Sequence, residues 1–285
     1  MIHITECPRD AMQGIKQQIP TDLKAEYLNQ LLKVGFRTID FGSFVSPKAI
    51  PQMQDTADVL KQLNLSGSKS KLLAIIANTR GAQDACAFEE ISYLGFPFSI
   101  SETFQQRNAN SSIQESLGRV EEIQNLCLKY DKQLLVYISM AFGNPYGDEW
   151  HPDIAINWCK KLEGMGIRNI ALADTVGSSV PESITHLFSS LLPELPSIEL
   201  GAHLHSTKEK AHEKIEAAYA AGCRYFDVAI HGFGGCPMAA EELTGNIATE
   251  DLEQFASGHK IDLGLNGVEL YKAYESSWKI FNNYH

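Results

Sequence analysis

Short apolar runs alternate with longer amphipathic segments along the whole of this 285-residue chain. Short apolar runs are typical of buried strands, and the longer segments have the spacing of helices with one apolar face. The predicted strands are Ile2–Glu6, Thr38–Phe41, Leu72–Ile76, Phe96–Ile100, Leu134–Met140, Asn169–Ala173, Ile198–His203 and Tyr225–Ala229. The predicted helices lie near Asp22–Lys33, Met53–Leu63, Ala82–Tyr93, Ile113–Tyr130, Pro152–Met165, Pro181–Leu191 and Lys208–Ala220. The glycines expected to separate a helix from the following strand are Gly35, Gly95, Gly166 and Gly222.

This alternation indicates an α/β fold with parallel strands, because a helix between two strands returns the chain to the same end of the sheet. Eight such units can close into a (β/α)8 TIM barrel, which takes about 250 residues. The tail Leu252–His285 would then supply an additional C-terminal helical segment. A doubly wound open sheet is the alternative, but the first strand lacks the Gly-rich turn that often accompanies it. Residues 1–285 contain no linker rich in Pro, Gly and Ser, so we expect a single domain.

Composition argues against several classes of function. The formal net charge of −11 disfavours a nucleic-acid partner, which requires a concentrated basic face. No apolar stretch approaches the ~18 residues of a membrane span, so no membrane partner is expected. The first strand begins at Ile2 and leaves no room for a signal peptide. The six cysteines lack CxxC spacing, which is typical of reduced thiols. A cytoplasmic protein is therefore expected.

In a TIM barrel, polar residues that follow the strands gather at the C-terminal end of the barrel. Here those positions carry acids, bases and metal-binding side chains. They are Arg9, Asp10, Gln13, Asp40, Ser43, Asn78, Arg80, Ser101, Glu102, Ser139, Asp174, Thr175, His203 and His205. The loop His231–Pro237, with Cys236 between glycines and a proline, follows the last strand. This set of groups favours an enzyme over an interaction scaffold.

His203 and His205 are two residues apart, a spacing that places both imidazoles on one face of a strand. For an isolated pair of this kind, two solvated histidines at a strand end are as good an interpretation as a metal site. With Asp10 at the same end of the barrel, the pair becomes a possible two-histidine, one-carboxylate metal site. Mixed nitrogen and oxygen ligation suits Mg²⁺, Mn²⁺, Zn²⁺ or Fe²⁺, and the spacing does not choose among them.

Other motifs allow both a structural and a chemical interpretation. Arg9 could form a surface ion pair with its neighbour, or could stabilise an oxyanion or enolate. Asp174 and Thr175 could cap a helix or could lie at the site. Ser43 could belong to a capped turn or contact a substrate chain. Cys236 taken alone is more readily a buried packing residue.

Six segments together resemble the 3-hydroxy-3-methylglutaryl-CoA lyase family, in the right order and over nearly the whole chain. They read PRDAMQG, SFVSPK with PQM following, LADTVG, AHLHST, GFGGCP and TGNIATEDL. Homocitrate and isopropylmalate synthases share the Arg-Asp and His-x-His elements but lack the GGCP loop, so they resemble this chain less well. The resemblance implies a metal-dependent lyase built on a TIM barrel.

The resemblance also implies roles for individual residues. The metal ligands for Mg²⁺ or Mn²⁺ would be Asp10, His203, His205 and Asn246. The catalytic residues would be Arg9, facing the thioester carbonyl, Asp40, and Cys236 as a mobile thiol. Residues near the substrate would be Arg9, Gln13, Ser43, Asp174 and Thr175. Several positions depart from the family pattern. Ala11 and Gly14 replace the usual Gly and Asn, Asp40 stands where Glu is usual, and Ser206 stands where an acidic residue often follows the second histidine. The segment between Cys236 and Asn246 is one residue longer than in the family pattern.

The activity implied is retro-Claisen cleavage of (S)-3-hydroxy-3-methylglutaryl-CoA to acetyl-CoA and acetoacetate. The alternatives are a Claisen-type synthase, an aldolase acting on a 4-hydroxy-2-oxo acid, a lyase for a close 3-hydroxy-acyl-CoA, and a barrel that binds acyl-CoA without turnover. An acyl-CoA is thus the expected small-molecule partner. The apolar tail Leu263–Phe281 suggests a homodimer contact.

Overall fold

Eight parallel strands close into a barrel in the computed structural model, which describes residues 1–235 and 244–284. The strands are β1 (His3–Glu6), β2 (Thr38–Ser43), β3 (Lys71–Ile75), β4 (Ile91–Ser99), β5 (Gln133–Ser139), β6 (Asn169–Asp174), β7 (Glu199–Leu204) and β8 (Tyr225–Val228). Each strand pairs with the next along the chain, and β1 pairs with β8 to close the ring. The prediction of a (β/α)8 TIM barrel is confirmed.

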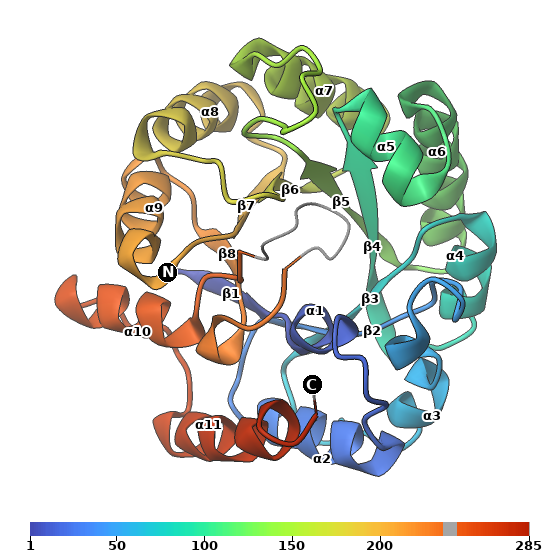
Figure 1. The fold of residues 1–285 in the computed structure, drawn as a ribbon, viewed down its shortest axis with the longest axis vertical. Coiled ribbons are helices and arrows are strands. Elements are labelled where there is room, and N and C mark those ends of the chain that lie inside the picture. The colour runs from blue at the N-terminus through green and yellow to red at the C-terminus, as the bar shows by residue number, and fades with distance from the viewer. Residues whose placement is uncertain (236–243, 285) are drawn as a thin grey trace.

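Helices surround the strands on the outside of the barrel, except α1 (Pro8–Gln13), which lies inside this ring of helices beside the ends of β1 and β2 (Figure 1). The others are α2 (Thr21–Leu31), α3 (Thr56–Leu60), α4 (Thr79–Cys86), α5 (Glu102–Ala109), α6 (Ile113–Lys129), α7 (Pro152–Gly164), α8 (Pro181–Glu194), α9 (Lys208–Ala220), α10 (Thr249–Gly258) and α11 (Gly267–Phe281). Two 3₁₀ turns, η1 (Pro51–Met53) and η2 (Ile230–Gly232), complete the set. The tail forms two helices, of which α11 packs against α2.

The predicted helix Ala82–Tyr93 was wrong at its C-terminal end. Helix α4 ends at Cys86, and β4 begins at Ile91. Gly95 therefore lies inside a strand and does not separate a helix from a strand. A Cβ at Gly95 would come within 2.5 Å of Ile75 Cδ1 and 3.1 Å of Tyr137 Cε2. The glycine is required there because neighbouring strands fill the barrel interior with larger side chains.

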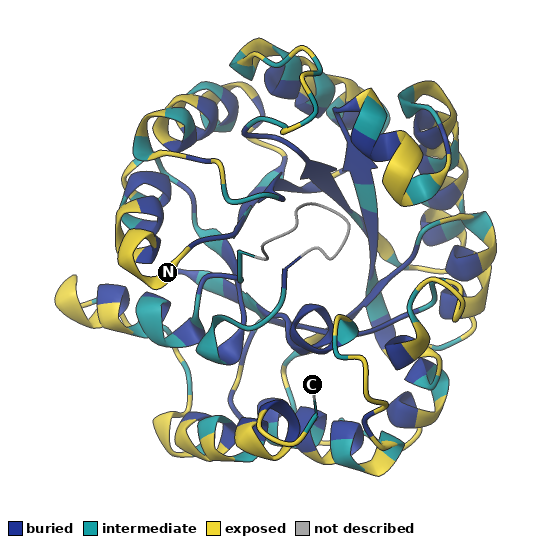
Figure 2. Cartoon of the chain, viewed as in Figure 1, coloured by how far each residue is buried: buried dark blue, intermediate teal, exposed yellow. Residues whose placement is uncertain are grey.

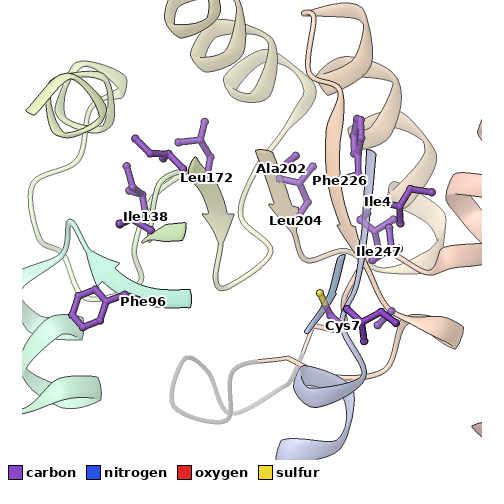
Figure 3. Close-up of a cluster of buried hydrophobic side chains, with 14 of the residues drawn as sticks. Ile4, Cys7, Phe96, Ile138, Leu172, Ala202, Leu204, Phe226 and Ile247 are labelled. Atoms are coloured by element: carbon purple, nitrogen blue, oxygen red, sulfur yellow. The ribbon is translucent and has the colours of Figure 1, made fainter. Parts of the chain in front are cut away.

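The main core lies between the strands and the outer helices. The buried faces of the helices turn toward the barrel and their exposed faces turn outward (Figure 2). Outward-facing strand residues such as Phe96, Ile138 and Leu172 belong to this core (Figure 3). A smaller apolar cluster of Leu73, Ile75, Tyr137 and Ala171 forms a separate group. Alternation along β7 sends Leu200, Ala202 and Leu204 into the outer core. The residues between them, including His203, point the other way, into the barrel.

Within the described residues, no helix has both the length and the apolar character needed to cross a membrane.

Candidate metal centre and active site

Three side chains from distant parts of the sequence converge at the C-terminal end of the barrel. Asp10 comes from α1, His203 from β7, and His205 follows β7 directly. Their metal-ligating atoms lie within 4.8 Å of one another. The two imidazoles face each other, with His203 Nε2 3.3 Å from His205 Nε2. The two histidines and the carboxylate therefore lie close enough together to form the predicted two-histidine, one-carboxylate arrangement.

Local sequence places these side chains. Pro8 occupies the first helical position, where its missing N–H costs nothing, so α1 starts immediately after β1. This buries Asp10, which is 6% exposed. On the other side, the backbone of His205 bridges that of Asn246 in an antiparallel sense. The bridge brings Asn246 next to the cluster formed by Asp10, His203 and His205. There the Nδ2 of Asn246 donates a 2.7 Å hydrogen bond to Asp10 Oδ2.

The polar atoms left over fit a divalent cation. Among the described residues, Asn246 Oδ1 and His205 Nδ1 are buried without a hydrogen-bond partner. A carboxylate, two imidazoles and an amide oxygen form a mixed donor set that suits a divalent ion. Burial lowers the pKa of His205 to about 4, with the neighbouring His203 contributing, so its imidazole is neutral and able to ligate at pH 7. This cluster could hold a metal ion.

A further carboxylate, Asp227 on β8, orients His203. Its Oδ2 lies 3.1 Å from His203 Nδ1. Burial alone would lower the pKa of His203, but the hydrogen bond and charge of Asp227 outweigh it and raise that pKa. With Nδ1 held by Asp227, the lone pair of Nε2 is free to face the cluster, as in metal sites where a carboxylate supports a ligating histidine. Ser206 stands where the resemblance leads one to expect such an acid, and Asp227 supplies one.

Sequence reasoning passed over Asp227. The available signal was a charged residue inside the otherwise apolar run Tyr225–Ala229. An acid buried in a strand needs a partner, because an unpaired buried charge is costly.

Arg9 joins the two acids of the site. Its Nε and Nη2 bond Asp40, with Nη2 2.6 Å from Oδ2, and its Nη1 bonds Asp10 Oδ1 at 3.0 Å. Gln13 contacts both, accepting from Arg9 Nη1 at 2.8 Å and donating to Asp10 Oδ1 at 2.7 Å. The guanidinium is therefore held rigidly at the edge of the cluster.

The two acids have opposite pKa shifts. Burial would raise the pKa of Asp10, but Arg9 and the two histidines of the cluster lower it to about 2. Burial raises the pKa of Asp40 to about 6 despite the ion pair with Arg9. Asp10 is therefore a permanent anion, whereas Asp40 can exchange a proton near neutral pH.

The structure places the other predicted residues less directly. Ser43 ends β2, and its hydroxyl accepts a hydrogen bond from the backbone of Val45. Thr175 Oγ1 accepts from the backbone N–H of Met140 at 3.0 Å. Helix α8 begins at Pro181, so the alternative in which Asp174 and Thr175 cap a helix was wrong. Cys236 lies outside the described residues.

Asp174 is fully buried in a polar network. Lys214 Nζ donates to Asp174 Oδ2 at 2.8 Å, and the backbone N–H and hydroxyl of Ser179 donate to the two carboxylate oxygens. The same ammonium donates to the carbonyl oxygen of His205 at 2.7 Å. Lys214 thus connects the end of β6 to the backbone of His205, a role that the sequence did not reveal.

Glycines let the backbone approach the cluster closely. Gly234 has φ +109°, and a Cβ there would come within 2.5 Å of Asn246 Nδ2 and 2.9 Å of Asp10 Oδ2. A Cβ on Gly245 would come within 2.2 Å of the carbonyl oxygen of Gly232. The backbones at Gly232 and Gly245 are therefore in direct contact beside the cluster.

Residues 2–276 match the HMGL-like family model. The chain belongs to the HMGL-like family. The resemblance drawn from the six motifs is thereby confirmed.

Relatives of this HMGL-like chain have similar sequences. Mouse "3-hydroxy-3-methylglutaryl-CoA lyase, cytoplasmic" is 38% identical over 273 residues, covering 94% of this chain and 77% of that protein. The human protein of the same name is 37% identical, with 94% and 71% covered. Bovine "Hydroxymethylglutaryl-CoA lyase, mitochondrial" is 35% identical, with 93% and 81% covered.

Solved structures agree with the fold. The HMG-CoA lyase of Acinetobacter baumannii, in complex with coenzyme A and 3-methylmalate, superimposes with a TM-score of 0.90 at 30% identity, covering 98% of this chain and 90% of that one. The HMG-CoA lyase of Brucella melitensis has a TM-score of 0.91 at 26% identity, with 99% of each chain covered.

Proposed function

We propose that this protein is a divalent-metal-dependent lyase that cleaves (S)-3-hydroxy-3-methylglutaryl-CoA to acetyl-CoA and acetoacetate. The observation that carries the proposal is the convergence of Asp10, His203 and His205 beside the fixed guanidinium of Arg9. The names of the mouse, human and bovine relatives support the substrate, and the coenzyme A complex of the Acinetobacter enzyme supports an acyl-CoA.

Asp10, His203, His205 and Asn246 are proposed to hold Mg²⁺ or Mn²⁺. Such an ion would polarise the C3 hydroxyl of the substrate and lower its pKa. The residues of the chain supply the remaining requirements. Asp227 holds His203 in the ligating orientation, and Arg9 presents positive charge from a buried position.

Cleavage begins when the C3 hydroxyl loses its proton, for which we propose Asp40 as the base. The C3 oxygen then forms the ketone of acetoacetate, the C2–C3 bond breaks, and its electron pair moves to C2. The resulting thioester enolate carries negative charge on oxygen, which Arg9 is placed to stabilise. Protonation of C2, proposed to come from Cys236, gives acetyl-CoA. Asp40 suits the first step because its pKa of about 6 makes it an anion at pH 7 that can accept a proton.

We propose that Gln13 and Ser43 contact the substrate together with Arg9. For Asp174 and Thr175 we propose an indirect contribution, because their polar atoms bond Lys214, Ser179 and Met140. The protein is proposed to act as one domain, as a homodimer through residues 263–281, and in the cytoplasm, the compartment named for the mouse and human relatives.

The test is acetoacetate production from the thioester by purified protein, with Mg²⁺, with Mn²⁺ and with EDTA, and with Asp10→Asn as the inactive control. We expect metal-dependent product that EDTA abolishes. A panel of 3-hydroxy-acyl-CoAs defines the substrate. Release of free CoA from acetyl-CoA plus a 2-oxo acid, or pyruvate from a 4-hydroxy-2-oxo acid, without acetoacetate from the first substrate, would replace the proposal with the synthase or the aldolase.

A further inference from the structure

His231 lies at the start of the glycine-rich loop and has an unusual backbone. Its φ is +62°, in the left-handed region that residues other than glycine seldom adopt. Three contacts hold it there. Its Nδ1 lies 2.6 Å from Glu250 Oε1, its backbone N–H donates to Glu250 Oε2 at 3.0 Å, and its ring stacks on Trp278 of α11 with centroids 4.0 Å apart. A residue held from three sides in a disfavoured conformation indicates a position that the fold imposes.

The next aromatic residue of the loop, Phe233, packs on the same helix. Its ring stacks on Phe281 with centroids 4.3 Å apart and meets Trp278 edge-on at 6.1 Å. Phe281 in turn contacts Tyr27 of α2 edge-on at 6.3 Å. His231 and Phe233 therefore pack against one side of α11, and α2 also packs against α11. Figure 1 shows α11 beside α2, at the outer edge of the molecule.

Phe233 also contacts Asn246, one of the proposed metal ligands. The carbonyl oxygen of Phe233 accepts a 2.9 Å hydrogen bond from Asn246 Nδ2, the same nitrogen that bonds Asp10. These two acceptors orient the amide and leave Asn246 Oδ1 as its free end. Gly234 then packs against Asn246 and Asp10 with no room for a side chain. A change in the position of the Phe233 carbonyl would therefore change the orientation of the Asn246 amide.

We infer that His231 and Trp278 are positioning residues, through which the C-terminal helix α11 sets the affinity of the cluster for its metal ion. The inference rests on the metal site of the proposed function. Neither residue touches the cluster. Their effect passes through the backbone of Phe233 to Asn246, and α11 itself packs against α2 and η2.

The experiment is calorimetric titration of metal-free protein with Mn²⁺, which reads the site without turnover. Trp278→Ala removes the stacking surface and should raise the Mn²⁺ Kd about tenfold, as loss of an outer support of a metal ligand does. Trp278→Phe retains an aromatic surface and should restore most of the affinity. Tyr271→Ala is the matched control: Tyr271 lies on the same helix and is 62% exposed, so its removal should leave Kd unchanged.

His231→Asn is an independent probe, because Asn tolerates the left-handed backbone but cannot stack on Trp278. It should weaken Mn²⁺ binding as Trp278→Ala does. The Mn²⁺ electron paramagnetic resonance spectrum of both variants should also differ from that of the wild type, because the ligand set is altered.

The outcomes separate the two proposals. Wild-type protein that fails to bind Mn²⁺, or binds it equally well after Asp10→Asn, would remove the proposed metal site and this inference with it. Normal wild-type binding with equal Kd in Trp278→Ala, His231→Asn and Tyr271→Ala would leave the metal site standing and overturn the inference. Equal weakening by Tyr271→Ala and Trp278→Ala would also overturn it, since the effect would then belong to the exposed face of α11.

Discussion

Replacing Gly234 with Ala should weaken metal binding at the proposed site far more than it destabilises the fold. The added Cβ would lie 2.5 Å from Asn246 Nδ2, 2.9 Å from Asp10 Oδ2 and 3.1 Å from the Asp10 carbonyl oxygen. Contacts this short do not persist, so either the amide or the carboxylate must move. The carbonyl of Asp10 belongs to a buried helix and cannot yield easily.

Two effects are expected: a loss of folding stability and a loss of metal-binding affinity. A positive φ at a residue with a side chain costs roughly 1–2 kcal/mol of stability. For a chain of this length that lowers the melting temperature by roughly 2–4 °C. Displacement of a ligand or its hydrogen-bond partner should in addition weaken metal binding about 10- to 100-fold. At about 1.4 kcal/mol per factor of ten, this is roughly 1.4–2.8 kcal/mol of binding free energy.

Gly67→Ala provides the matched control. Gly67 has φ +81° and nothing within 4 Å of the added Cβ, so it carries the backbone cost without the collision. Both variants should melt a few degrees below the wild type in differential scanning calorimetry. Only Gly234→Ala should raise the Mn²⁺ Kd and lower acetoacetate production. Equal Mn²⁺ affinities in the two variants would refute the close approach of residue 234 to the cluster.

Further predictions concern buried charges. Asp227→Asn should raise the Mn²⁺ Kd about 10- to 100-fold in calorimetry, because His203 loses the carboxylate that orients it; an unchanged Kd would contradict that role. Lys214→Met should lower the free energy of unfolding by about 3–5 kcal/mol in urea titrations, because it leaves the Asp174 charge buried and unpaired. Adding Asp174→Asn should recover part of this loss, and a double variant no more stable than the single one would argue against the pair. Burial raises the pKa of Glu6 from 4.5 to about 8, so the unfolded chain releases this proton first and stability should fall as pH rises from about 4.5 to about 8. Glu6→Gln should flatten that dependence in urea titrations between pH 5 and 8.5, and an identical slope would count against the shift.

Strand positions and helix positions were predictable because each depends on a short stretch of chain. The periodicity of apolar residues located all eight strands except the first half of β4, which was predicted to be helical up to Tyr93. The alternation along β7 predicted that His203 and His205 share one face. The error at Gly95 arose from contacts that are distant in the sequence. Gly95 was expected to end a helix, but its role is steric and depends on Ile75 and Tyr137, which approach from neighbouring strands.

The partners of charged residues were not predictable in the same way. Arg9 was recognised as a candidate, but its bidentate contact with Asp40 joins residues 31 positions apart, and no pattern in the sequence specifies it. Asn246 and Asp10 are 236 positions apart. The contact between Asn246 and Asp10 forms only when β8 pairs with β1, because closure of the barrel brings the two ends of the chain together.

The sequence by itself determined the eightfold strand–helix alternation, the placement of polar groups after the strands, and the family to which the motifs belong. These features follow from period-two and period-3.6 patterns and from short motifs, all of which act over a few residues. The tertiary structure alone decided that Asp227 contacts His203, that Lys214 pairs with Asp174, and that His231 and Phe233 pack on α11. The physical reason is that burial and charge pairing depend on which segments meet in space, and in this barrel those segments are separated by long stretches of chain.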